Sequence, residues 1–330
     1  MKAVIFKEFG AADAVLEQVE MEIPQPGVGE VLVRLYSSGV NPSDVKKRAG
    51  AFPNLLDEGA VIPHSDGAGV VTAVGEGVSA SRIGERVWVY QAQFERRLGT
   101  LAEYVALASD LAPSLPDAAS FDVGACLGIP AMTAHRCVMG DGSVAGQTVL
   151  ITGGAGRVGY YAIQWAVAEG ARVIATASNP EDASVCRDLG AVAVCNHRED
   201  NWGHLVLECN DGKPVDRVVD VEFGANLPEV LACIRTGGVI STYSSTQEKE
   251  PQLPFLRMMY MDLTVHLVIV YAMPQEAKRE AIEAIDEALR QDRLQHRIAH
   301  IAALDEAAAA HKLIEGGTVR GCVLVRTGEE

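Results

Sequence analysis

From residue 2 to about residue 121, hydrophobic residues fall in short runs separated by glycine and proline. The runs lie at 3–6, 31–36, 67–74, 86–90 and 102–107. Short strands at this spacing, broken by turns, are typical of a β-rich unit of the barrel type. The pattern predicts one helix among them, over 42–49.

The pattern changes after the Pro-rich segment 112–116, where apolar strands alternate with helical stretches. It predicts strands at 148–152, 172–177, 191–196, 216–221 and 238–243, and helices at 158–169, 181–189, 202–210 and 227–235. Parallel strands need crossover connections, which helices supply. The alternation therefore predicts an α/β fold with a doubly wound parallel sheet of the Rossmann type.

The last part of the chain mixes both kinds of element. Segment 263–273 is apolar but shorter than the roughly 18 residues of a membrane span, so it is predicted to be a buried strand. An amphipathic helix over 274–290, a helix near 305–315 and a strand over 322–325 follow. We expect this tail to return to the first domain and complete it.

A glycine-rich turn follows the first strand of the alternating region. Gly154, Gly156 and Gly159 satisfy G-x-G-x-x-G between a predicted strand and a predicted helix. In that setting the glycines allow a tight turn, a close approach of the backbone to a pyrophosphate, and close packing of the helix, whose N-terminus faces the phosphates. The alternative is a glycine-rich connection without a ligand, but the β/α setting favours dinucleotide binding.

The end of the next strand bears on the choice of cofactor. An acidic residue there would bind the ribose of NAD, but the run 175–179 reads Ala-Thr-Ala-Ser-Asn. Ser178, with His197 or Arg198, is a candidate donor to a 2′-phosphate, which favours NADPH. The acidic pair at 181–182 and the lack of a basic residue within the run argue in the other direction.

Charge and cysteine content limit the partners. The chain has 28 basic and 44 acidic residues, a net charge of −16, which disfavours nucleic acid as a partner. A Lys7–Glu8 charge pair follows the first apolar run too closely for a secretory signal, and no membrane partner is expected. The seven cysteines are scattered without a Cys-x-x-Cys pair, which fits a reducing cytoplasm.

Several stretches in order along the chain resemble one family. They are 38–44 (Ser-Gly-Val-Asn-Pro-Ser-Asp), 66–71, 75–78, 84–87, 101–104, 128–136 and 196–199. On these motifs the chain resembles the zinc-independent quinone oxidoreductases of the medium-chain dehydrogenase/reductase superfamily, the zeta-crystallin type in particular.

The resemblance implies a GroES-like catalytic domain over 1–121 with 271–330, a Rossmann domain over 122–270, and NADPH in a cleft between them. It also implies a homodimer or homotetramer and a small-molecule quinone or enone substrate. Besides the motif glycines, the resemblance assigns cofactor contacts by position to Ala155, Gly156, Arg157, Val158, Ser178, His197, Asn226, Tyr243, Ser244, Ser245 and Thr246. Arg157 replaces a glycine that is usual in the family, so it either faces solvent or adds a cation near the pyrophosphate.

Zinc-dependent relatives would place a cysteine at Asn41, a His-Glu pair at 65–66 and a third ligand at Ile129. A catalytic zinc needs about three protein ligands, and these positions offer at most Asp66. His64 is one residue out of register and is interpreted as a loop or core histidine. The sequence therefore predicts a zinc-independent enzyme.

Without a Lewis acid, a carbonyl accepts hydride efficiently only if it is electron-poor or if donors stabilise the oxyanion. The hypothesis is direct hydride transfer from NADPH to such an acceptor, with Asn41 and Lys46 as catalytic candidates and Lys46 as stabiliser or proton donor. Lys46 also fits a solvated face of a short helix, and Asn41 also fits a turn before proline. Where relatives often carry tyrosines beside the substrate, this sequence has Lys46 and Phe52.

Two other functions share these motifs. An alkenal or enone (enoyl) reductase would differ only in the shape of its pocket. A catalytically weak NADPH-binding sensor, or an RNA-binding or structural protein, would keep the nucleotide site without turnover, although the acidic total argues against RNA.

Overall fold

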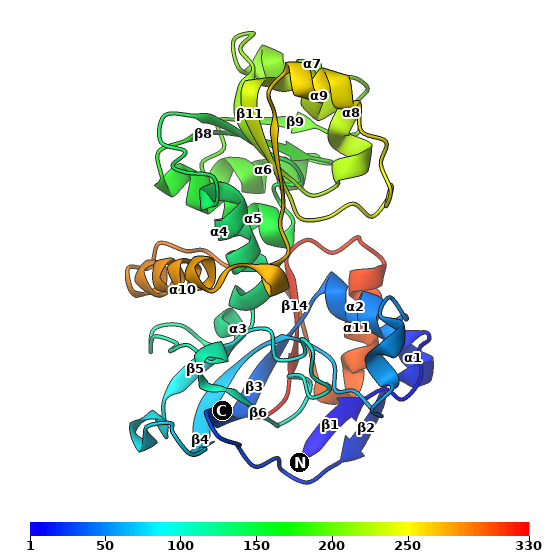
Figure 1. Cartoon of the computed structure of the whole chain (residues 1–330), viewed down its shortest axis with the longest axis vertical. Coiled ribbons are helices and arrows are strands. Elements are labelled where there is room, and N and C mark those ends of the chain that lie inside the picture. Colours follow the sequence, from blue (N-terminus) through cyan, green and yellow to red (C-terminus); the bar gives the residue numbers. More distant parts are fainter. Residues whose placement is uncertain (330) are drawn as a thin grey trace. The chain divides into compact units, whose positions relative to one another are not determined.

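A computed structural model describes residues 1–329 (Figure 1), and the chain divides into two compact units. Unit 1 comprises Met1–Ile129 and the chain from Ile282 onward, and unit 2 comprises Pro130–Ala281. These divisions fall 8 and 11 residues after the expected ones at 121/122 and 270/271. One cause is helix α3 (Phe121–Gly124), which packs on unit 1, where the Phe121 ring stacks on Tyr36 at 4.7 Å.

Unit 1 is built mainly of antiparallel strands. Its main sheet has the order β13-β14-β3-β4-β5, with β6 also paired to β3, while β1 and β2 form a separate pair. The strands are β1 (Lys2–Ile5), β2 (Glu17–Glu20), β3 (Glu30–Val40), β4 (Asp66–Val74), β5 (Arg86–Val89), β6 (Tyr104–Ala108), β13 (Ile298–Ala302) and β14 (Cys322–Arg326). The helices are α1 (Ala12–Val15), α2 (Pro42–Arg48), α3 and α11 (Ala307–Glu315), and α10 (Gln275–Arg290) crosses from unit 2 into unit 1.

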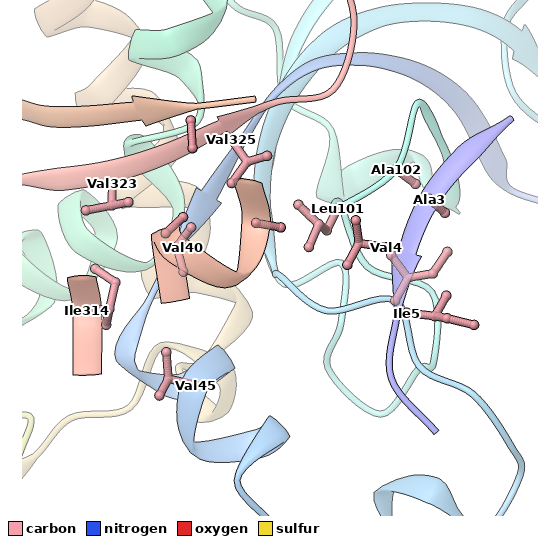
Figure 2. Close-up of a cluster of buried hydrophobic side chains, with 14 residues drawn as sticks. Ala3, Val4, Ile5, Val40, Val45, Leu101, Ala102, Ile314, Val323 and Val325 are labelled. Carbon is pink, nitrogen blue, oxygen red and sulfur yellow. The ribbon is translucent and has the colours of Figure 1, made fainter. Parts of the chain in front are cut away.

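The C-terminal tail completes unit 1. Strand β14 pairs antiparallel with β3, so that Val323 faces Val40 across the ladder. Figure 2 shows Val323, Val325 and Ile314 in one buried cluster with Val40 and Leu101. Residues 3–5 of β1 belong to the same cluster, so the first and last strands of the chain share one core. Each such buried aliphatic side chain contributes about 1.5–3 kcal/mol to folding. The tail therefore supplies part of the core of unit 1.

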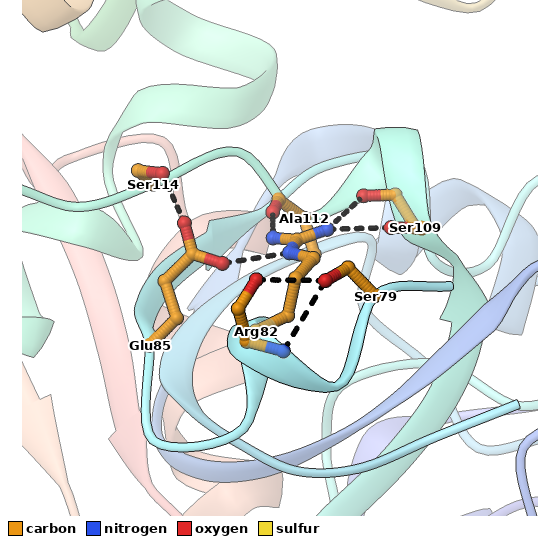
Figure 3. Close-up of polar contacts among 7 residues, drawn as sticks. Ser79, Arg82, Glu85, Ser109, Ala112 and Ser114 are labelled. Atoms are coloured by element: carbon orange, nitrogen blue, oxygen red, sulfur yellow. Dashed lines mark hydrogen bonds and ion pairs between the residues drawn. The ribbon is translucent and has the colours of Figure 1, made fainter.

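An arginine fixes the turn that leads into β5. The half-buried Arg82 donates to Glu85 Oε2 at 2.6 Å, to the Ser109 carbonyl at 2.7 Å and to the Ala112 carbonyl at 2.5 Å (Figure 3). Glu85 in turn accepts a hydrogen bond from the Ser114 hydroxyl. This network ties the loop before β5 to the segment that follows β6.

Unit 2 is a single parallel sheet with the order β12-β11-β10-β7-β8-β9. Its strands are β7 (Thr148–Ile151), β8 (Arg172–Ala177), β9 (Ala193–Asn196), β10 (Val215–Asp220), β11 (Ile234–Thr242) and β12 (Thr264–Leu267). Its helices are α4 (Met132–Met139), α5 (Arg157–Ala168), α6 (Pro180–Asp188), α7 (Trp202–Cys209), α8 (Phe223–Cys233) and α9 (Phe255–Tyr260). The strand order reverses beside β7, as in a doubly wound fold, so the predicted parallel sheet is confirmed.

Three predictions need correction. Segment 263–273 is not a buried strand, because β12 covers only 264–267 at the sheet edge and Leu267 is 73% exposed. Helix α8 begins at Phe223, before its predicted start, although Pro228 lies inside it, and β11 begins at Ile234. The sequence analysis also did not predict several elements, namely α1, α3, α4, α9, β2 and β13.

Candidate active site

The predicted glycine turn connects β7 to α5 within unit 2. Gly153 has a φ of +60°, a backbone conformation that favours glycine. Gly156 is the N-cap of α5 and has no side chain to cap the helix. Amide groups at a helix N-terminus bind anions, because the backbone donors and the helix dipole both favour negative charge. The turn therefore fits the pyrophosphate of a dinucleotide.

Gly159 is the most tightly enclosed glycine of this turn. A Cβ atom at Gly159 would lie 2.4 Å from the carbonyl oxygen of Gly153 and 2.9 Å from the Cα of Gly154. Arg157, the first residue of α5, is half-buried, so it is not a fully solvated side chain. The close packing of the helix start on the turn is the role that the motif assigns to its third glycine.

Hydrogen bonds join the turn to the next two strands. Thr176 in β8 is fully buried, and its Oγ1 accepts from the amide of Gly153 at 3.0 Å. The same oxygen lies 3.2 Å from Nδ1 of His197, which follows β9. His197 is thus held beside the turn through one threonine. The sequence pattern gave no sign of Thr176, since a buried strand threonine has no motif.

The end of β8 carries the residues that bear on the ribose phosphate. Ser178 is half-buried at the carboxyl end of the strand. Asn179 caps α6, accepting from the Asp182 amide at 2.9 Å and donating to Asp182 Oδ2 at 2.7 Å. The buried Asp182 carboxylate is thereby engaged with its own helix cap. These hydrogen bonds hold the Asp182 side chain at its own helix cap and leave the negative charge of 181–182 beside the expected phosphate site.

The remaining predicted cofactor residues follow β10 and β11. Asn226 donates to Asp220 Oδ1 at 2.8 Å, and burial raises the pKa of Asp220. Ser245 accepts from the Gly224 amide at 3.0 Å, and the amide of Thr246 donates to Glu222 at 2.8 Å. Sequence reasoning did not single out Glu222, which holds this loop.

All of these residues lie at the carboxyl ends of neighbouring parallel strands. They include the half-buried Tyr243 and Ser244, which directly follow β11. Ligands of open α/β sheets bind at that edge, next to the reversal of strand order. The structure therefore brings the predicted cofactor residues of unit 2 together.

The two catalytic candidates lie in unit 1 at helix α2. Asn41 is the N-cap and is 3% exposed, and its backbone N–H donates to Asp44 Oδ2 at 2.8 Å. Pro42 occupies the first helical position, where its missing N–H costs nothing. This cap fixes the start of a helix on which Lys46 is exposed while Lys47 is buried.

Asp66, the first residue of β4, fixes the side chain of Asn41. The Asn41 Nδ2 donates to Asp66 Oδ2 at 2.8 Å, and the Ile129 amide donates to the same oxygen at 2.8 Å. Burial raises the pKa of Asp66 to about 8, an effect that the Ile129 and Asn41 hydrogen bonds oppose and the Asp44 charge adds to. Burial therefore favours the protonated form of the Asp66 carboxyl, while the two N–H groups that donate to its Oδ2 favour the charged form.

Two further ionisable groups share this buried region. Burial raises the pKa of Asp44 to about 6, against the opposing charge of Lys47. Burial also lowers the pKa of Lys47, whose Nζ donates to the Gln93 carbonyl at 2.5 Å. Lys47 was read in the sequence only as a neighbour of Lys46. Consecutive residues of a helix point in different directions, so the adjacent positions of Lys46 and Lys47 were a signal that one could be exposed and the other buried.

His64 lies in the core of unit 1, as one of its two interpretations held. Its Nδ1 lies 2.8 Å from Ser38 Oγ and its Nε2 lies 2.9 Å from Nε2 of His311 on α11. Burial, and then the neighbouring His311, lower the pKa of His64 well below its ordinary value, and burial lowers that of His311 to about 3. The two rings form a neutral hydrogen-bonded pair that joins the tail to β3.

These residues do not fit a catalytic zinc ion. Position 41 offers an amide and position 129 offers a backbone N–H, and both donate to the Asp66 carboxyl. His64 is engaged by Ser38 and His311 instead. Within residues 1–329, three or more His, Cys, Asp or Glu side chains are nowhere grouped so as to hold a metal ion.

Comparison with known proteins agrees with this arrangement. Residues 27–117 match the family model described as "Alcohol dehydrogenase GroES-like domain", and 158–287 match "Zinc-binding dehydrogenase". The quinone oxidoreductase of Sus scrofa is 31% identical over 315 residues, which cover 94% of this chain and 93% of that protein. The chain belongs to the quinone oxidoreductase family. The recognition from the sequence is confirmed, and the chain is an oxidoreductase of the medium-chain dehydrogenase/reductase superfamily.

Other members and neighbours extend the comparison. The crystal structure of Escherichia coli quinone oxidoreductase complexed with NADPH has a TM-score of 0.88 and 25% identity, over 99% of this chain and 100% of that one. The 2-haloacrylate reductase of a Burkholderia species is 29% identical over 98% of both chains. The predicted combination of a GroES-like domain and a Rossmann domain is confirmed. Among residues 1–329, no single helix is both long enough and apolar enough to span a membrane.

Proposed function

We propose that this family member is an NADPH-dependent, zinc-independent reductase of quinones or similar electron-poor carbonyl compounds. The observation that carries the proposal is the glycine turn at the carboxyl end of β7, with Ser178 and His197 at the ends of the next two strands. The NADPH complex of the E. coli neighbour supports the choice of cofactor. The names of relatives such as the Sus scrofa protein support the quinone.

The chain's own residues are assigned three tasks. When bound, NADPH supplies a hydride that an electron-poor carbonyl accepts. We assign the pyrophosphate to the turn with Gly154, Ala155, Gly156, Arg157, Val158 and Gly159, and the 2′-phosphate to Ser178 and His197. Asn226, Tyr243, Ser244, Ser245 and Thr246 are assigned to the rest of the cofactor.

Asn41 and Lys46 are assigned to the acceptor. The hydrogen bond to Asp66 fixes the orientation of the Asn41 amide, so the amide can donate to a developing oxyanion without reorganising. Lys46 is exposed and therefore able to meet a bound molecule, whereas Lys47 is held by Gln93. Reduction of a quinone also consumes one proton, which Lys46 is assigned to supply.

An enone or haloacrylate type of substrate is the second candidate. The Burkholderia relative is named a 2-haloacrylate reductase, and its similarity spans nearly the whole of both chains. Phe52 is 51% exposed and Lys46 is exposed, at the two positions where quinone-reducing relatives often carry tyrosines. An activated C=C bond next to a carbonyl accepts hydride for the same electronic reason that a quinone does.

The test is NADPH oxidation across a panel of quinones, enals, enones and haloacrylates, with and without a metal chelator. We expect turnover with quinones at a rate that the chelator leaves unchanged. Faster turnover with enones or haloacrylates would replace the quinone by the second candidate. Tight NADPH binding without turnover across the panel would instead identify a sensor. Titration with both cofactors is expected to show tighter binding of NADPH, and equal affinity for NADH would contradict the assignment of Ser178 and His197.

The assembly and its location are part of the same proposal. The resemblance suggests a homodimer or homotetramer. The exposed Leu267, at the end of edge strand β12, and Ile269, just after that strand, support contact between copies. Sedimentation analysis tests this, and a monomer at micromolar concentration would contradict it. Within residues 1–329 the seven cysteines form no disulfide, which supports a reducing cytoplasm.

A further inference from the structure

Two thiols of unit 2 are in direct contact. The Sγ of Cys195 lies 3.6 Å from the Sγ of Cys209. Cys195 lies in β9 and is 4% exposed, whereas Cys209, the last residue of α7, is partly exposed. All seven cysteines lie in the described part of the chain, and the other six are buried. Cys209 is thus the thiol within reach of dissolved reagents, and it has a second thiol beside it.

The fold holds both cysteines against the same neighbouring strand. Cys195 pairs with Thr176 in the parallel ladder between β9 and β8. The carbonyl of Cys209 accepts from Arg172 Nη2 at 3.3 Å, and Arg172 Nε also donates to Asn210 Oδ1 at 3.3 Å. Because Arg172 begins β8, that strand anchors both thiol-bearing segments. The contact between the sulfurs therefore follows from the arrangement of the sheet and α7.

The environments of the two thiols differ in a way that assigns their order of reaction. Burial, and then the adjacent Cys209, raise the pKa of Cys195 to about 12. A thiolate is the nucleophilic form of cysteine, so Cys195 is protected both by protonation and by burial. Cys209 therefore meets an oxidant first, and Cys195 is placed to react with the oxidised sulfur.

We propose that Cys195 and Cys209 form an oxidant-sensitive dithiol that closes to an intramolecular disulfide in the presence of a peroxide. The Cys209 thiolate attacks one oxygen of hydrogen peroxide, the O–O bond breaks, and Cys209 becomes a sulfenic acid while hydroxide leaves. The Cys195 sulfur then attacks the Cys209 sulfur, the S–O bond breaks, and water leaves with the Cys195 proton. In total two thiols lose two electrons and two protons, and one peroxide becomes two waters.

A second thiol pair in unit 1 provides an internal control. The thiol of Cys126 hydrogen-bonds to that of Cys322, but both residues are buried. Contact between sulfurs is therefore common to both pairs, and exposure of one member distinguishes them. If access controls the reaction, Cys195 and Cys209 oxidise in the native protein and Cys126 and Cys322 do not.

The experiment treats the native full chain with hydrogen peroxide, blocks remaining thiols with N-ethylmaleimide after denaturation, and digests with trypsin without reductant. Cleavage at Arg187, Arg198 and Arg217 separates the two cysteines onto peptides 188–198 and 199–217, because Lys213 precedes a proline and is not cut. We expect a cross-linked pair of these peptides that phosphine reductant separates. Loss of the free Cys209 thiol should be at least about tenfold faster than loss of the Cys126 thiol.

Two variants complete the test. Cys209→Ser should abolish the cross-link and leave Cys195 fully alkylated, and Cys195→Ser should stop Cys209 at a sulfenic acid that dimedone labels. Circular dichroism checks that each variant is folded. If Cys195→Ser does not fold, the Cys209→Ser variant alone tests the proposal. The proposal is overturned if Cys209 is oxidised further, or cross-linked between chains, while Cys195 of the wild type stays alkylated. It is equally overturned if Cys126 and Cys322 oxidise as fast as this pair.

Discussion

The glycine turn of unit 2 and the polar cluster around Asn41 in unit 1 are held together by different kinds of atoms. The turn is formed largely by main-chain groups of adjacent residues, with Gly159 packed on Gly153. The cluster consists of side chains from separate segments, such as Asn41 of α2 and Asp66 of β4. A main-chain turn does not titrate, whereas the cluster contains carboxyls with pKa values raised to about 6 and about 8.

The difference has consequences for both function and stability. The turn depends on the absence of side-chain atoms, so any added atom disturbs it regardless of pH. The cluster depends on the protonation of buried groups, so its contribution to the free energy of unfolding changes with pH. Each region therefore has a perturbation that affects it and leaves the other unchanged.

The largest expected effect is the pH dependence of stability that Asp66 introduces. Because burial raises its pKa to about 8 from 3.8, the folded state binds a proton that the unfolded state has released. The contribution of protonated Asp66 is fully present below about pH 3.8 and is lost as the pH rises through about 8. Relative to Asp66→Asn, the wild type should lose on the order of a few kcal/mol of unfolding free energy over this window.

Urea unfolding at a series of pH values measures this difference. Asp57→Asn is the control, since Asp57 is an exposed residue of unit 1 and its charge is hydrated in both states. Asp44 remains in all three proteins, so its own loss of stability through about pH 6 is present in every profile. It cancels between wild type and Asp57→Asn, whereas Asp66→Asn also removes the Asp66 charge that interacts with Asp44. Parallel profiles for wild type and Asp66→Asn between pH 4 and pH 8 would show that Asp66 is charged in the folded protein.

The two regions also mark how far the sequence could be interpreted. The turn was predicted residue by residue, because G-x-G-x-x-G constrains the backbone of neighbouring residues. The cluster was not, because its partners are far apart in sequence. His64 was placed in a loop or the core, but its contact with His311 on the tail has no local signal. Lys46 was chosen as the candidate, whereas the helix turns Lys47 toward the buried carboxyls.

The prediction for β12 was wrong for a related reason. A local apolar run indicates a strand but not its position in the sheet, and this one lies at the edge with Leu267 exposed. Conversely, the alternation of strands and helices after residue 147 does determine a parallel sheet, because each crossover is local to two strands. Local connections were predictable here, whereas the return of the tail to unit 1 was the one contact between remote segments that was expected.

The second effect concerns the turn. A Cβ at Gly159 would lie 2.4 Å from Gly153 O, so Gly159→Ala requires the backbone to shift. Such overpacking costs about 1–3 kcal/mol, and NADPH affinity should fall about 10- to 100-fold if the cost falls on the bound form. The affinity is measured by fluorescence titration, and thermal unfolding by circular dichroism separates loss of binding from loss of folding.

A graded series makes this prediction specific. Gly156→Ala places its Cβ 3.1 Å from the same oxygen and should cost less, and Gly316→Ala, at 3.4 Å from the nearest atom and with a φ of −65°, should cost almost nothing. Affinities that do not follow this order, or a Gly159→Ala protein that binds NADPH like the wild type, would remove the turn from the cofactor site. None of the three substitutions should alter the pH profile assigned to Asp66.

The smallest expected effect is that of Lys46, on the exposed side of the helix that Asn41 caps. Its charge is screened by solvent, so Lys46→Ala should lower kcat/KM for quinones by only about three- to tenfold. If Lys46 acts through its positive charge, Lys46→Arg should retain most of the activity. If Lys46 donates a proton, Lys46→Arg should retain less, because a guanidinium does not deprotonate. Lys213→Ala, which removes an exposed lysine of unit 2, should have no effect on kcat/KM.

Higher ionic strength should reduce the difference in kcat/KM between wild type and Lys46→Ala, since screening weakens an exposed charge and leaves the Asn41–Asp66 hydrogen bond intact. If Lys46→Ala turns over every acceptor as fast as the wild type, the residue belongs only to a solvated helix face, and the acceptor's polar contacts must come from Asn41 alone.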